Sequence, residues 1–137
     1  MVRITRAIEF SSSLRYRVPG LSREENERLF GRAAAPHGHN YRLEVSLRGE
    51  PDPVTGMVMD LKDLKELLER EIEARFDHRD LVADTPYFEK RVATPENFAL
   101  LLHGLLADAL PAGRLDRVRL YQDADCFVDV TSPEALP

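Results

Sequence analysis

The sequence predicts an α+β fold in which two strands, two long helices and two further strands follow one another in the order ββααββ. In the first third of the chain and again near its C-terminal end, apolar and polar side chains alternate, which is typical of half-buried antiparallel strands. Between these segments, apolar residues recur every three or four positions, as on the buried face of a helix. Two hairpins that flank two helices favour one four-stranded antiparallel sheet with both helices on one face.

The first two strands and a short helix are predicted in the N-terminal part of the chain. Apolar and polar residues alternate from Val2 to Phe10, and the alternation from Asn40 to Arg48 is strict. Between these strands, Ser22 followed by Glu25 matches a capping box, in which each side chain bonds the backbone N–H of the other residue. We therefore expect a short helix from Arg23 to Phe30.

Two long helices are predicted in the middle of the chain. The first begins at Asp60 and ends near Asp77, and its apolar face consists of Leu61, Leu64, Leu68, Ile72 and Phe76. The second has Thr94 as its N-cap and Pro95 at its first position, and it is expected to stop at Gly113. The side chains that this second helix is expected to bury are Phe98, Leu101, Leu102, Leu105 and Ala109.

The last two strands form a predicted hairpin across a tight loop from Asp123 to Asp125. Val118 and Leu120 alternate with arginines before the loop, and a second apolar series of Cys126, Val128 and Val130 follows it. Cys126 is therefore expected to be a small core residue. A four-stranded sheet has two unpaired edges, which a second copy of the chain could cover, so we expect an oligomer.

Composition excludes several classes of protein. A chain of 137 residues is expected to form a single domain over residues 1–137, and 43% apolar residues supply a core. The net charge of −5 argues against a nucleic-acid partner. No apolar run is long enough for a membrane span and no secretory signal is present, so we expect a soluble, cytoplasmic protein.

Two histidine motifs could carry chemistry. His37 and His39 lie where a loop runs into the second strand, and residues two apart in extended chain project to the same side, so both could bind one zinc ion. The alternative is a polar turn before the strand.

His78 follows Asp77 at the end of a helix, where it could be a general base held by the carboxylate, or a side chain that offsets the helix dipole. Ser11 to Ser13 supply hydroxyls, but no glycine elbow flanks them, so no nucleophile is predicted.

Several stretches in a specific order resemble one family, from the Glu9-Phe10-Ser11 strand end to the last hairpin. The strongest are Leu29-Phe30-Gly31, His37-Gly38-His39-Asn40-Tyr41, the run from Asp52 to Leu61, Asp77-His78, Pro86-Tyr87-Phe88 and Glu96-Asn97. The chain resembles the 6-pyruvoyltetrahydropterin synthases and their bacterial relatives, the 6-carboxytetrahydropterin synthases.

The resemblance implies the tunnelling fold, in which the sheets of several subunits join into a barrel, commonly in a hexamer with active sites between subunits. It also implies three zinc-binding histidines and a lyase reaction on 7,8-dihydroneopterin triphosphate, in tetrahydrobiopterin or queuosine-related biosynthesis. The expected partners are a pterin-like small molecule and further copies of this chain.

Matched residue by residue, the resemblance assigns metal binding to His37 and His39, and acid–base catalysis to Asp77 and His78. It also assigns contacts with the substrate, at Gln122, Thr94 and Glu96.

Three positions depart from the family pattern. Leu14 stands where the first metal histidine is expected, Ala33 replaces the catalytic cysteine, and Gln122 replaces the glutamate that grips the pterin ring. Two histidines are fewer than the three ligands of a catalytic zinc, so we expect low zinc occupancy. Asp123 is not expected to substitute for the missing glutamate, because neighbours on a strand point to opposite faces.

These losses cluster at the site while the scaffold motifs remain. The sequence therefore predicts a folded family member whose usual lyase reaction is impaired or replaced. The alternatives are an enzyme that acts on a different pterin or purine, and a non-catalytic binding or assembly paralogue.

Overall fold

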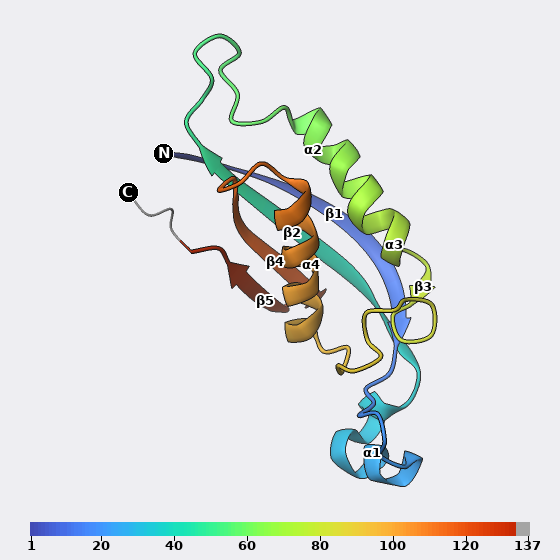
Figure 1. Ribbon diagram of the computed structural model, residues 1–137. Coiled ribbons are helices and arrows are strands. Elements are labelled where there is room, and N and C mark those ends of the chain that lie inside the picture. Colours follow the sequence, from blue (N-terminus) through green and yellow to red (C-terminus); the bar gives the residue numbers. More distant parts are fainter. Residues whose placement is uncertain (134–137) are drawn as a thin grey trace.

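A five-stranded sheet carries helices on one face in the computed structural model, which describes residues 1–133 (Figure 1). The strand order is β3-β1-β2-β4-β5, and all pairs are antiparallel except β1 with β3. The strands are β1 Val2–Leu14, β2 His37–Gly49, β3 Arg79–Asp80, β4 Leu115–Asp123 and β5 Cys126–Thr131. The predicted α+β class is confirmed, but the sheet has five strands and not four.

The unpredicted strand, β3, pairs in parallel with Ser12 and Ser13 at the end of β1. Its two residues are too few to show any alternation, so no sequence pattern could reveal it. The side chain of Ser13 strengthens the pairing, because its hydroxyl donates to a carboxylate oxygen of Asp80 at 2.8 Å.

The central strands are longer than predicted. β1 continues through the serines to Leu14, and β2 begins at His37, so both metal-candidate histidines lie inside a strand and not in a loop. The two strands pair along their whole length, from Val2 opposite Gly49 to Leu14 opposite His37.

The helices begin where their caps predict. The Ser22 capping box is present, and Asp60 and Thr94 each accept a hydrogen bond from a backbone N–H of the first turn. The helical segments are α1 Arg23–Phe30, the 3₁₀ turn η1 Gly31–Ala34, α2 Leu61–Leu68, the π turn η2 Glu69–Glu73, α3 Ala74–Phe76 and α4 Pro95–Ala109.

The predicted end of α4 at Gly113 is wrong. The helix stops at Ala109, and Leu110 is already extended, with φ −98° and ψ 157°. Pro111 is the cause, because a proline disfavours the helical conformation of the residue before it.

Three details of the predicted core also differ. Leu61 at the start of α2 is 46% exposed, and Leu101, Leu105 and Ala109 of α4 are only half-buried. The inner face of α4 is instead formed by Phe98, Ala99, Leu102 and Leu106.

Cys126 is exposed, contrary to the expected core position. It is the first residue of the edge strand β5, directly after the hairpin turn, and a shift in the pairing register between β4 and β5 lies beside it. Val128 and Val130, farther along the strand, do pack against the core.

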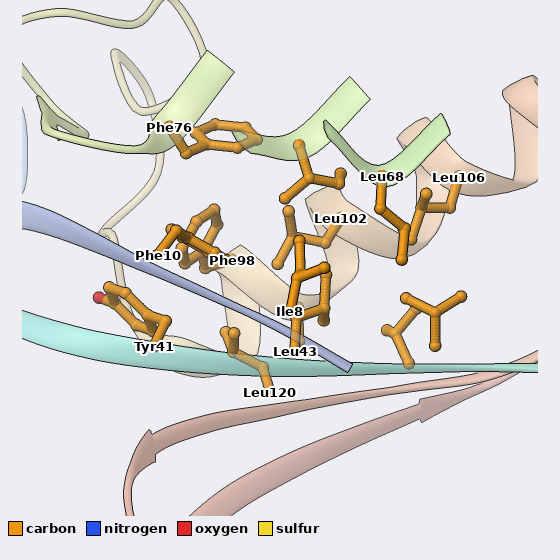
Figure 2. Close-up of a cluster of buried hydrophobic side chains, with 14 of the residues drawn as sticks. Ile8, Phe10, Tyr41, Leu43, Leu68, Phe76, Phe98, Leu102, Leu106 and Leu120 are labelled. Carbon is orange, nitrogen blue, oxygen red and sulfur yellow. The ribbon is translucent and has the colours of Figure 1, made fainter. Parts of the chain in front are cut away.

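The core lies between the sheet and the helices α2 to α4, and Phe98 is at its centre (Figure 2). The Phe98 ring lies within 5.1–6.0 Å, between centroids, of four other rings, those of Phe10, Tyr41, Phe76 and Phe88. This aromatic cluster joins α4 to β1, β2 and the end of α3.

Helix α1 lies apart from this core, beyond the ends of β1 and β2 that are far from the N-terminus (Figure 1). The motifs with candidate chemistry gather at the same end of the sheet. None of the helices in residues 1–133 combines the length and apolar character needed to cross a membrane.

Replacing Phe98 by Ala should lower the free energy of unfolding by about 3–5 kcal/mol, because a fully buried ring leaves a cavity that the cluster cannot fill. Urea denaturation measures the change. The matched control is Leu100→Ala on the same helix, where the side chain is 52% exposed and the expected change is within about 0.5 kcal/mol. Equal losses in the two variants would contradict the central position of Phe98.

Candidate functional site

The two histidines of β2 lie side by side on the face of the sheet that the helices cover. Their ring centroids are 5.2 Å apart, and the rings are nearly perpendicular. They share this face with the buried Tyr41, whose ring is 5.6 Å from that of His39, because alternate residues of a strand point the same way. The Nδ1 atom of His37 is 2.8 Å from the carbonyl oxygen of Ala35, which fixes the orientation of the ring.

Leu14 occupies the position opposite His37 on the neighbouring strand. Its side chain is 1% exposed and belongs to the hydrophobic core. The position opposite His37 is therefore filled by a packed apolar side chain that cannot bind a metal ion.

A carboxylate that the sequence did not predict lies beside His39. The Oδ1 atom of Asp123 is 3.8 Å from the Nδ1 atom of His39. In the β4–β5 ladder, Tyr121 pairs with Phe127 and Asp123 pairs with Cys126, so Gln122 is an extra residue in a β-bulge. A bulge re-aims the following side chain, and the expectation that Asp123 points away from the site is therefore wrong.

Burial and charge act in opposite directions on His39. Burial lowers the pKa of His39 below its ordinary value, the carboxylate of Asp123 partly opposes that shift, and His37 adds to it. The imidazole is therefore neutral at pH 7 and can accept a hydrogen bond or donate a lone pair.

Asp77 and His78 form a second imidazole–carboxylate pair at the end of β1. The Nδ1 atom of His78 is 3.0 Å from Asp77 Oδ1, and the same oxygen accepts the backbone N–H of Ser11 at 2.9 Å. This hydrogen bond from Ser11 is the main reason that the pKa of Asp77 is lowered, so the carboxylate remains charged. The contact through Nδ1 leaves the other ring nitrogen, Nε2, on the side of the ring away from Asp77.

His78 has a left-handed backbone, with φ 57°, which is uncommon for a residue other than glycine. Its N–H donates to the carbonyl oxygen of Ser11 at 2.7 Å, so hydrogen bonds in both directions tie this turn to β1. The histidine is thus held by β1 in a conformation that the end of a helix alone would not impose.

The three serines of β1 are structural. Their hydroxyl groups donate to Asn40 Oδ1, the Phe76 carbonyl and Asp80 Oδ2, each at 2.7–2.8 Å. Each hydroxyl thus joins β1 to a neighbouring segment.

His39 lies between two cavities. One, of about 440 Å³, is lined by His39 and His78, together with the serines and Asp80. The other, of about 720 Å³, is lined by His39, Gln122 and Asp123, together with polar residues of the open face of the sheet. His39 therefore borders both the cavity that contains His78 and the cavity that contains Gln122 and Asp123, whereas His37 and Asp77 line neither of them.

Thr94 and Glu96, the other predicted substrate contacts, line neither of these two cavities. Thr94 caps α4, because its hydroxyl accepts the backbone N–H of Asn97 at 3.2 Å. Glu96 is exposed near Tyr16, and after burial its charge is the largest cause of the raised pKa of that phenol.

Ala33 is adjacent to the site through η1. Its carbonyl oxygen accepts the backbone N–H of Tyr16 at 2.7 Å, and the ring of Tyr16 is 5.9 Å from that of His37. A methyl group at this position has no proton to exchange.

The donor set does not fit a catalytic zinc, which uses three protein ligands. Two imidazoles are present, and Leu14 has no lone pair to offer. Within residues 1–133, no three His, Cys, Asp or Glu side chains are arranged to hold a metal ion together. Asp123 contacts only one of the two histidines closely and does not complete the set.

Known proteins similar to this chain agree on one family. The family model described as 6-pyruvoyl tetrahydropterin synthase matches residues 3–133. The human protein named 6-pyruvoyl tetrahydrobiopterin synthase is 46% identical over 121 residues, which span 87% of this chain and 83% of that protein. The namesake from Dictyostelium discoideum is 38% identical over 125 residues, or 91% and 92% of the two chains. The solved structure of the Caenorhabditis elegans 6-pyruvoyl tetrahydropterin synthase superimposes with a TM-score of 0.88 at 32% identity, over 96% of each chain.

Replacing Asp123 by Asn should lower the pKa of His39 further, because this carboxylate is the group that raises it. In an NMR titration, the midpoint of the imidazole should then lie at lower pH than in the unmodified chain. Asp125→Asn in the same hairpin turn is the control and should leave the midpoint unchanged. A similar shift in both variants would mean that net charge, and not the bulge geometry, acts on His39.

Proposed function

The chain belongs to the 6-pyruvoyl tetrahydropterin synthase family, and we propose that it binds a pterin-like small molecule while the family's lyase reaction is impaired or altered. The observation that carries this proposal is the burial of Leu14 opposite His37. A reaction in which a metal polarises substrate hydroxyls loses its main support when one of three ligands becomes a core leucine.

Ring recognition is proposed for the cavity beside the β4–β5 hairpin. A pterin presents two adjacent N–H donors, which suit a carboxylate, whereas the amide of Gln122 offers one acceptor and one donor. Leaving one of these N–H donors buried without an acceptor would weaken binding by roughly 1–3 kcal/mol. The carboxylate of Asp123 lines the same cavity, and we assign to it the acceptor that Gln122 lacks.

Proton transfer is proposed for Asp77 and His78. The charged carboxylate holds the imidazole through Nδ1, and 83% of the His78 side chain is exposed, so Nε2 can reach a bound ligand. Asp77 and His78 keep the geometry of a general base, whereas the metal site is incomplete. An intact proton carrier without the metal supports altered chemistry on a different pterin or purine.

A second candidate function, a non-catalytic assembly partner, is supported by the open sheet edges. Within residues 1–133, β3 covers only Ser12 and Ser13 of β1, and β5 forms the opposite edge. Unpaired backbone at two edges favours pairing with further chains. We therefore propose an oligomer, by resemblance a hexamer in which sheets join into a barrel, and co-purification with an intact paralogue would favour the assembly function.

The purified chain should contain zinc well below one equivalent, and Leu14→His should raise the content to about one per chain, because it restores the third ligand. Elemental analysis after gel filtration measures this. The control is the double variant Leu14→His/His39→Gln, which should lose the gain. One tightly bound zinc per unmodified chain would contradict the proposed loss of the site.

The combined variant Leu14→His, Ala33→Cys and Gln122→Glu should increase turnover of 7,8-dihydroneopterin triphosphate by about a hundredfold or more, since it restores a metal ligand, a proton carrier and a ring anchor. Release of inorganic triphosphate measures the reaction. If the variant folds and binds zinc but remains inert, the assignment of these three positions is wrong. Rapid turnover by the unmodified chain would show instead that the reaction is not impaired.

A further inference from the structure

The phenol of Tyr41 is a buried polar group to which the described chain offers no partner. Tyr41 is 2% exposed, yet its hydroxyl forms no hydrogen bond within residues 1–133. In this part of the chain, the side-chain polar atoms that are both fully buried and unpartnered belong to Arg17 and Arg117, so the Tyr41 oxygen itself remains accessible from outside. A buried hydroxyl without a partner is unfavourable, and a bound molecule would supply the partner.

Packing fixes the direction of this phenol. The ring stacks on that of Phe10 at 5.4 Å between centroids, and the ring of Phe98 contacts it edge-on at 5.2 Å. Figure 2 shows the phenol oxygen on the side of the ring away from Leu43, which is the next residue of β2 on the same face. Along the strand this is the direction of His39, whose ring centroid is 5.6 Å from that of Tyr41. The hydroxyl thus points out of the core toward the histidine pair.

The neighbouring imidazole supplies a complementary acceptor. The Nδ1 atom of His39 faces the carboxylate of Asp123 at 3.8 Å, and a carboxylate only accepts, so the ring proton belongs on Nδ1 and the lone pair on Nε2. A phenol that donates beside an imidazole that accepts matches a hydroxyl group, which accepts from the first and donates to the second. A carbonyl oxygen would leave the imidazole lone pair without a donor.

We propose that Tyr41 is a specificity-determining residue that, together with His39, binds a hydroxyl group of the ligand. The aromatic packing holds the phenol in place before the ligand binds, so little freedom is lost on binding. The inference rests on the proposed function, since the ligand is taken to be a pterin-like molecule and the hydroxyl then belongs to a side chain of its ring.

Calorimetric titration of the metal-free chain at about pH 8, where the imidazoles are neutral, tests the inference with two compounds. These are 7,8-dihydroneopterin and 6-methyl-7,8-dihydropterin, which share the ring, but only the first has hydroxyl groups on its side chain. The unmodified chain should bind 7,8-dihydroneopterin at least about tenfold more tightly. Tyr41→Phe should remove this preference, because it weakens the binding of 7,8-dihydroneopterin about tenfold and leaves that of the methyl compound unchanged.

Stability separates this role from a structural one. Tyr41→Phe should leave the midpoint of urea denaturation unchanged or raise it, because the chain loses a hydroxyl that has no partner in it. Tyr87→Phe is the matched control. Arg75 donates to the Tyr87 hydroxyl at 2.7 Å, so this variant should be slightly less stable but should bind both compounds like the unmodified chain. A lower midpoint in Tyr41→Phe would show that its hydroxyl already has a partner within the chain and would overturn the proposal.

The remaining outcomes distinguish the inference from the proposed function. If Tyr41→Phe binds both compounds like the unmodified chain, or loses affinity for both equally, the assignment of a ligand hydroxyl to Tyr41 is wrong and pterin binding stands. Equal affinity of the unmodified chain for the two compounds has the same meaning. If the unmodified chain binds neither compound, the proposed pterin-like ligand is wrong and the inference falls with it.

Discussion

The antiparallel pairing of β1 with β2 determines where the candidate functional side chains lie. Thirteen residues pair with thirteen, and the register brings Leu14 opposite His37 and Ser12 opposite His39. A slip of one residue would send every side chain to the other face of the sheet. The same register aligns Phe10 with Tyr41 in the aromatic cluster, so the packing that stabilises the fold also fixes the histidines.

The position opposite His37 borders both the histidine pair and the hydrophobic core. A leucine there joins the core, where 1% of its surface is exposed, and gains the burial energy of an aliphatic side chain. An imidazole would need a metal or a hydrogen-bond partner to be buried there. Leu14 therefore contributes to packing and has no lone pair to offer to a metal ion.

The charged groups near the two histidines differ in sign between the two sides of the pair. On one side, the bulge in β4 turns the carboxylate of Asp123 toward His39. On the other, Tyr16 connects His37 to a cavity beside α1 that is lined by four arginines. His78 lines the second cavity of His39, and Asp77 contacts its Nδ1 atom.

The sequence by itself determined the fold class, the helix caps and the histidine and Asp77-His78 motifs, because periodicity and capping are local properties of the chain. Only the tertiary structure revealed the two-residue strand β3, the exposure of Cys126 and the carboxylate beside His39. The strand β3 and the contact of Asp123 with His39 depend on segments distant in sequence, and Cys126 lies beside a register shift in the β4–β5 hairpin. A bulge in β4 shifts the pairing with β5 by one residue, and no pattern within either strand specifies where that extra residue falls.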